Sequence, residues 1–152
     1  MSANLAKDRV EQNRRVTNRG RVLVGGLIVC PIGSAVLECT VYDSSESGAK
    51  IRVSDERRIP SEFYFVNLKR QNAYNTQLIW RRSHFAGLSL RDAHALDEPL
   101  PEEMENVYRP FVRAKLRQIG TLIRNGHSLE ECLSFTGVDR LTYERWRRAD
   151  RS

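Results

Sequence analysis

LECTVYDSSESGAKIRV, residues 37–53, is the stretch that decides the fold. Apolar residues take every second position on both sides of the polar run DSSESG: Leu37, Cys39 and Val41 precede it, and Ala49, Ile51 and Val53 follow it. A period of two is typical of a β-strand with one buried face, and a polar run rich in Ser and Gly between two such segments is typical of a turn. The stretch therefore predicts two strands joined by a tight connection.

Further strand signals lie on both sides of this pair. They are Val22–Cys30, Phe63–Val66, Tyr74–Arg81 and Ala86–Leu90. In Tyr74–Arg81 we expect Leu78 and Trp80 to share one face. About six short strands at this spacing are typical of an all-β barrel or sandwich. We therefore predict a mainly β fold, a six-stranded antiparallel barrel.

An uncharged stretch, Val22–Leu37, follows several arginines, as the apolar part of a signal peptide does. Gly25, Pro31 and Gly33 interrupt it, and it is shorter than the roughly 20 apolar residues of a membrane-spanning helix. Two buried strands joined by a turn at Pro31–Ser34 explain the stretch better. We expect no membrane span.

The composition changes after the last strand signal. Leu96–Pro101 contains two prolines and predicts a linker. Glu102–Asn125 has apolar residues at helical spacing, and because Pro110 lies inside it we expect a kink or two consecutive helices near Arg109. Gly126 predicts the end of this helical segment.

A second helical segment follows at once. Ser128 and Glu131 have the spacing of a capping box, Gly137 predicts the end of that helix, and Arg140–Arg148 resumes helical character. We divide the chain into a basic flexible arm (1–21), a β-barrel (22–95) and an α-helical extension (96–152).

The charge is concentrated at the start of the chain. The net charge is +6, and residues 1–21 carry six Lys or Arg against two Asp or Glu. Such a segment attracts anions, but the same charge is also expected of a solvated basic tail without a ligand. The three cysteines are an odd number without CxxC spacing, which argues against a disulfide framework or a zinc site and favours a reducing cytoplasm.

Two short motifs lie on either side of the first two predicted strands. Arg15-Val16-Thr17-Asn18-Arg19 fits RxxxR, and Asp43-Ser44-Ser45-Glu46-Ser47-Gly48 fits DxSxxG, 24 positions later. In this order, at this separation and within a six-strand pattern, the motifs resemble those of the PilZ domain family, β-barrels that bind the bacterial second messenger cyclic di-GMP. The resemblance covers about residues 13–90 and includes the strands around Leu78–Arg81 and Gly87–Leu90.

The resemblance implies ligand-binding roles for Arg15, Arg19, Asp43, Ser45 and Gly48. Less directly, it implies an influence of Arg14, just before the motif, on ligand stoichiometry. These residue types suit the ligand, because the guanidinium fork binds phosphate and the guanine O6/N7 edge bidentately and stacks on a base. A carboxylate accepts hydrogen bonds from guanine N–H groups, and glycine permits close backbone approach or positive φ. The alternative is that the arginines are solvated arm residues and Asp-Ser-Ser is an ordinary hairpin turn.

The C-terminal helices, residues 126–148, more weakly resemble a helix-turn-helix. In that interpretation Arg140, Arg145, Arg147 and Arg148 contact DNA phosphates. The alternative is a helical appendage that packs on the barrel or mediates homodimerisation. Its expected core is Leu129, Cys132, Leu133, Leu141 and Trp146.

Enzyme chemistry has little support in the sequence. His84, His94 and His127 lack metal-ligand spacing, and the Walker, HExxH and GxSxG motifs are missing. We expect a cytoplasmic bacterial receptor for cyclic di-GMP that needs no cofactor or metal and signals by ordering its arginine arm toward a partner protein. The alternative is an interaction or DNA-binding module of the same fold that does not bind the nucleotide.

Overall fold

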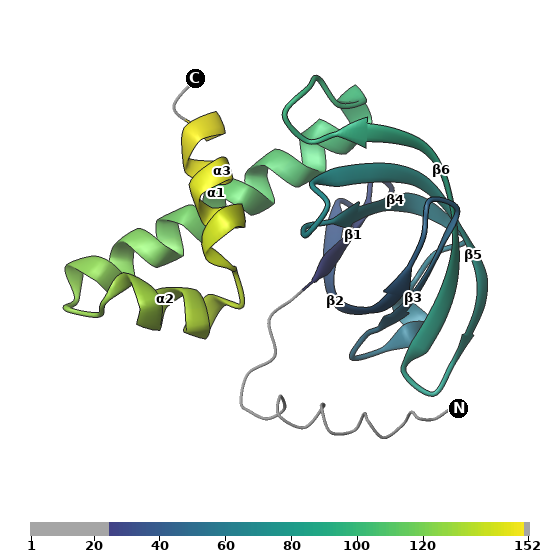
Figure 1. Cartoon of the computed structure of the whole chain (residues 1–152), viewed down its shortest axis with the longest axis horizontal. Helices are drawn as coiled ribbons and strands as arrows, with labels where there is room; N and C mark the ends of the chain where they lie inside the picture. Colours follow the sequence, from purple (N-terminus) through teal and green to yellow (C-terminus); the bar gives the residue numbers. More distant parts are fainter. Residues whose placement is uncertain (1–24, 151–152) are drawn as a thin grey trace.

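The computed structural model describes residues 25–150, in which six antiparallel strands form a closed barrel and three helices follow (Figure 1). The strands are β1 (Gly26–Cys30), β2 (Ala35–Ser44), β3 (Gly48–Arg52), β4 (Glu62–Asn67), β5 (Asn72–Arg82) and β6 (Phe85–Ala95). Their order around the barrel is β1-β2-β3-β6-β5-β4, and pairing between β1 and β4 closes it. The predicted six-stranded antiparallel barrel with a helical extension is confirmed.

The interior of the barrel is filled by residues that alternate along the strands, as the period-two pattern predicts. Ile28, Leu37, Cys39, Ile51, Phe63, Phe65, Tyr74, Ala86 and Leu88 belong to this cluster. Phe65 is fully buried and its ring stacks on Tyr74, with 6.3 Å between the ring centroids. The short 3-10 helix Glu56–Arg58 connects β3 to β4.

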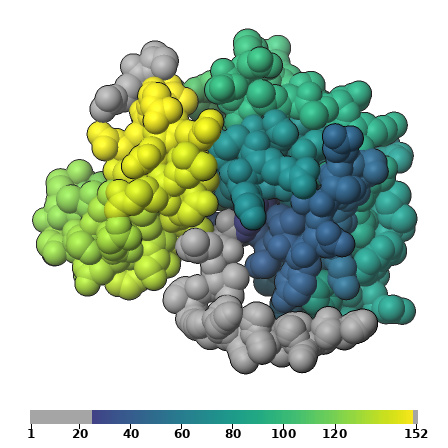
Figure 2. Space-filling model, viewed as in Figure 1, coloured from purple at the N-terminus to yellow at the C-terminus, as the bar shows by residue number. Residues whose placement is uncertain are grey.

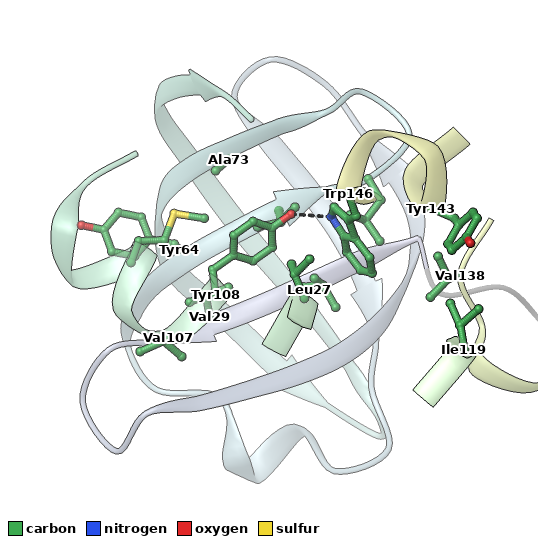
Figure 3. Packing of buried hydrophobic residues seen from close by; sticks show 14 of the residues in the cluster. Leu27, Val29, Tyr64, Ala73, Val107, Tyr108, Ile119, Val138, Tyr143 and Trp146 are labelled. Carbon is green, nitrogen blue, oxygen red and sulfur yellow. Dashed lines mark hydrogen bonds between the residues drawn. The ribbon is translucent and has the colours of Figure 1, made fainter. Parts of the chain in front are cut away.

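A second core covers the outer face of β1 and β4. It unites Leu27, Val29, Tyr64 and Val66 of these strands with residues of the helices, among them Met104, Val107, Tyr108 and Trp146 (Figure 3). Both faces of these two strands are therefore buried. Their sequences accordingly show nearly continuous apolar runs.

The first helix, α1 (Glu102–Arg124), runs without interruption through Pro110, so the expectation of two consecutive helices is wrong. Proline removes the N–H that would bond to the carbonyl of Asn106. Both residues are exposed, which lets water bond to that carbonyl. The helix ends where Gly126 adopts a φ of 99°, as its position in the sequence predicts.

The other helices are α2 (Leu129–Thr136) and α3 (Arg140–Asp150). The predicted capping box of Ser128 and Glu131 is present, and Gly137 ends α2 in a left-handed conformation with φ 74°. The prediction that Leu141 belongs to the core is wrong, since it is 48% exposed. The Asp139 carboxylate accepts from the Thr142 N–H at 2.8 Å, and in the register of α3 Tyr143 and Trp146 face inward instead.

The helical extension is docked on the barrel by polar as well as apolar contacts. The Lys115 ammonium lies 2.8 Å from the Glu38 carboxylate of β2 and donates to the Thr136 carbonyl at 3.3 Å. The Tyr64 hydroxyl of β4 donates to Glu103 at 2.5 Å. Within the helices, Trp146 Nε1 donates to the Tyr108 hydroxyl at 2.9 Å (Figure 3). The barrel and its extension thus share one continuous set of contacts.

Burial of the Tyr108 hydroxyl makes the free energy of unfolding depend on pH in the alkaline range. Burial raises the pKa of the Tyr108 hydroxyl to about 12, while the hydrogen bond from Trp146 opposes the rise. An unfolded tyrosine titrates near pH 10. The neutral phenol therefore contributes fully below about pH 10, and its contribution of about 2–3 kcal/mol is lost as the pH rises toward 12.

Tyr108→Phe is expected to lower the free energy of unfolding by about 1–3 kcal/mol at pH 7, because the buried Trp146 N–H loses its acceptor. Above about pH 10 the difference in free energy of unfolding between the wild-type protein and Tyr108→Phe should narrow. Only the wild-type protein must then keep a buried Tyr108 hydroxyl protonated. Urea denaturation of both proteins at about pH 7 and 11 measures this difference at each pH. A difference that stays constant with pH would contradict the raised pKa of Tyr108.

Candidate functional site

The DSSESG segment forms the connection between β2 and β3. The Ser45 N–H donates to the Gly48 carbonyl at 2.8 Å, and the Gly48 N–H donates to the Ser45 hydroxyl at 3.2 Å. Gly48 is outside the left-handed region, and a Cβ there would lie 3.4 Å from the Leu88 carbonyl oxygen. Ser45 therefore fixes the shape of the turn, and Gly48 allows close approach of two backbones rather than a positive φ.

Asp43 lies on the outer surface of the barrel immediately before this turn. It is exposed and pairs in register with Lys50 of β3, so both side chains lie on the same face. Within residues 25–150, its carboxylate has neither a hydrogen bond nor an ion pair. Asp43 is thus an acceptor with free capacity next to a rigid turn.

The same face continues across two more strands to an exposed tryptophan. Lys50 pairs with Gly87 of β6, and Gly87 pairs with Trp80 of β5. A Cβ at Gly87 would lie 2.1 Å from Trp80 Nε1, so the indole lies directly over this glycine. Asp43, Lys50, Gly87 and Trp80 form a transverse row over four strands, which we call the outer row.

The prediction that Leu78 and Trp80 share a face is wrong. The β5–β6 register shifts between these two residues, so an extra residue, Ile79, is accommodated there. Leu78 packs against the barrel interior, whereas Trp80 is 43% exposed on the outside. A bulge changes which residues share a face, and the alternation pattern alone does not reveal it.

A cluster of aromatic and basic side chains borders the outer row. The Tyr42 and Phe85 rings meet edge to face, with 5.3 Å between their centroids. The Lys50 ammonium lies 5.1 Å and the Arg52 guanidinium 5.8 Å from the Phe85 centroid. This face combines an exposed indole, cations and one free carboxylate, a set that suits a ligand with both bases and phosphates. Figure 2 shows the β2–β3 region, in blue, at the surface of the barrel.

Three of the predicted ligand-binding residues, Arg14, Arg15 and Arg19, lie outside the described residues. Of the predicted set, the structure brings Asp43, Ser45 and Gly48 together around one turn. Lys50 and Trp80 were missed by the sequence analysis. The mid-strand position of Gly87 was the available signal, because such a glycine often marks the close approach of another group.

The four arginines proposed for DNA contact fall into two different surroundings. Arg140 pairs with Glu130 and lies 3.9 Å from Glu144, and Arg147 lies 5.7 Å above the Tyr143 ring. Arg145 and Arg148 instead line a cavity beside α1. The structure does not test DNA binding, which stays a prediction.

Among residues 25–150, no helix is both long and apolar enough to cross a membrane. The same part of the chain holds no cluster of three or more His, Cys, Asp or Glu side chains suited to a metal ion. Comparison with known protein families and with curated proteins finds no match for this sequence.

Proposed function

We propose that this protein is a cytoplasmic bacterial receptor of the PilZ type that binds cyclic di-GMP between its arginine arm and the outer row of the barrel, without catalysis. The observation that carries the proposal is the exposed Asp43 carboxylate. It has no partner among the described residues and directly precedes the turn fixed by Ser45 and Gly48. An acceptor held in this way is preorganised for a ligand with N–H donors.

The chemistry of the outer row matches the parts of cyclic di-GMP. The Watson–Crick edge of guanine offers N–H donors to the Asp43 carboxylate, a charge-assisted interaction. The exposed Trp80 indole offers a stacking surface for a base, and Lys50 offers a cation for a phosphate. Arg15 and Arg19 add bidentate contacts to the phosphates or to guanine O6/N7.

The arm is long enough to reach this face. Gly26 lies seven positions after Arg19, which allows a span of up to about 25 Å between the two residues. Gly26 pairs with Cys39, and Asp43 lies four residues further along β2, about 13 Å away. The arm, which leads into β1, is therefore long enough to lie over the turn and close on a bound ligand.

Signalling would follow from a shift in population toward the closed arm. The ligand must favour the closed state by more than the conformational entropy that ordering the arm costs. Strand β2 contains both Glu38, which pairs with Lys115 of α1, and Asp43 at the proposed site. A partner protein that recognises the closed arm beside the helices would then respond to the ligand.

Asp43→Ala is expected to weaken cyclic di-GMP binding about 10- to 100-fold, because charge-assisted hydrogen bonds contribute about 1.5–3 kcal/mol. Glu46→Ala is the matched control, since Glu46 is an exposed acid in the same turn but outside the DxSxxG positions. Calorimetric titration with cyclic di-GMP, and with GTP to test selectivity, measures the effect. Equal weakening by both substitutions would point to general charge rather than to Asp43. No heat with the wild-type protein would refute the receptor function itself.

A further inference from the structure

A cavity of about 480 Å³ lies between α1, α3 and the linker that follows β6. Its apolar wall includes Leu96, Pro99, Leu100, Val112 and Trp146. A volume of this size is within the range of small-molecule sites, and such sites combine apolar walls with a few placed polar groups. The linker and the helices supply the lining except for Gln71 of the β4–β5 connection, and none of the lining residues belongs to the outer row.

Most charged side chains that line the cavity form ion pairs or lie at its exposed rim. Arg109 pairs with Glu105 at 2.8 Å, and Arg113 pairs with Asp150 at 3.2 Å. Asp97 and Glu98 lie at the exposed rim, and Arg148 lines the α3 side.

Arg145 is different from these groups. Its Nε atom is shielded from solvent and has no hydrogen-bond partner in residues 25–150. A guanidinium N–H removed from water without an acceptor is unfavourable, so such a group in a cavity wall calls for an acceptor.

We propose that this cavity binds a small organic anion. The acidic group of the ligand, a carboxylate, sulfonate or phosphate ester, pairs with the Arg145 guanidinium in the cavity wall, and a rotamer change of Arg145 brings its Nε–H to the ligand as donor. Its apolar body lies against Leu96, Pro99 and Leu100. An inorganic anion fits less well because it leaves the apolar wall uncovered. The site is independent of the proposed cyclic di-GMP site.

The probe is 8-anilinonaphthalene-1-sulfonate, which joins an aromatic body to one sulfonate. The chain has two tryptophans, so Trp80→Phe leaves Trp146 in the cavity wall as the only indole donor. In this background we expect saturable binding with energy transfer from Trp146. Benzoate should displace the probe, and inorganic phosphate at the same concentration should not.

Arg145→Gln is expected to weaken probe binding about tenfold or more, since it removes a charged donor. Arg145→Lys retains the charge without the Nε–H and should also weaken binding. If circular dichroism shows that Arg145→Gln does not fold, the probe affinity of Arg145→Lys tests the proposal instead. Arg147→Ala is the matched control, because Arg147 lies over the Tyr143 ring outside the cavity, and it should bind the probe normally.

Three outcomes overturn the proposal. The first is the absence of probe binding with energy transfer from Trp146. The second is normal binding by the folded Arg145 variants, which would place the probe elsewhere. The third is displacement by phosphate as effective as that by benzoate, which would remove the role of the apolar wall.

Discussion

Replacing either Arg15 or Arg19 with alanine is expected to weaken cyclic di-GMP binding by at least about a hundredfold, below calorimetric detection. Each guanidinium is proposed to make more than one charge-assisted hydrogen bond, and each such bond contributes about 1.5–3 kcal/mol. Arg19→Lys should restore little, because an ammonium lacks the planar fork that binds phosphate or guanine bidentately. The affinity of each variant is measured by calorimetric titration.

The control for both substitutions is Arg9→Ala, which removes a positive charge from the same basic segment but lies outside RxxxR. Its affinity should change little beyond a general electrostatic effect that salt screens. The thermal unfolding midpoint of each variant is measured alongside its affinity, so that a loss of binding can be told apart from a loss of folding. Wild-type affinity in both motif variants would show that the RxxxR assignment is wrong.

Replacing Trp146 with alanine is expected to lower the free energy of unfolding by about 3–5 kcal/mol, the range for removing a large buried aromatic side chain. Trp146 is 6% exposed, and its ring meets Phe111 edge to face with 6.4 Å between the centroids. The substitution also leaves the Tyr108 hydroxyl without the N–H that bonds to it. Urea denaturation followed by circular dichroism measures the loss.

Phe135→Ala is the matched control in the same extension. Phe135 is an aromatic residue of α2 that is 62% exposed, so its removal should change the free energy of unfolding by less than about 0.5 kcal/mol. Similar losses in the two variants would contradict the packing of α3 described above. A large loss for Trp146→Ala alone would confirm that α3 is held against α1 through this side chain.

The barrel was predictable because local alternation and the inward face coincide in β2 and β3. The burial of Tyr64 and Val66 on the outer face of β4 was not, since it depends on α1 and α3, which come later in the chain. Leu141 was misplaced for a related reason. The face that α3 buries is the one that packs against the rest of the extension, through Tyr143 and Trp146, and apolarity alone does not identify it.

The candidate site was predictable only where it is contiguous in sequence. Asp43, Ser45 and Gly48 belong to one turn and were identified from their spacing. Lys50 and Trp80 come to the same face, on either side of Gly87, through the register of three strands and a bulge at Ile79. Strand register and bulges arise from pairing between distant segments, so local patterns do not specify them.

The most direct test of the account is to locate the ligand by ¹H–¹⁵N NMR titration of the full chain with cyclic di-GMP. We predict that the shifts concentrate on the amides of Ser45, Ser47, Gly48 and Lys50 and on the indole N–H of Trp80. The indole N–H of Trp146 should move little, because it is buried against Tyr108 in the helical extension. An unchanged spectrum, or shifts confined to α2 and α3, would contradict the proposed site.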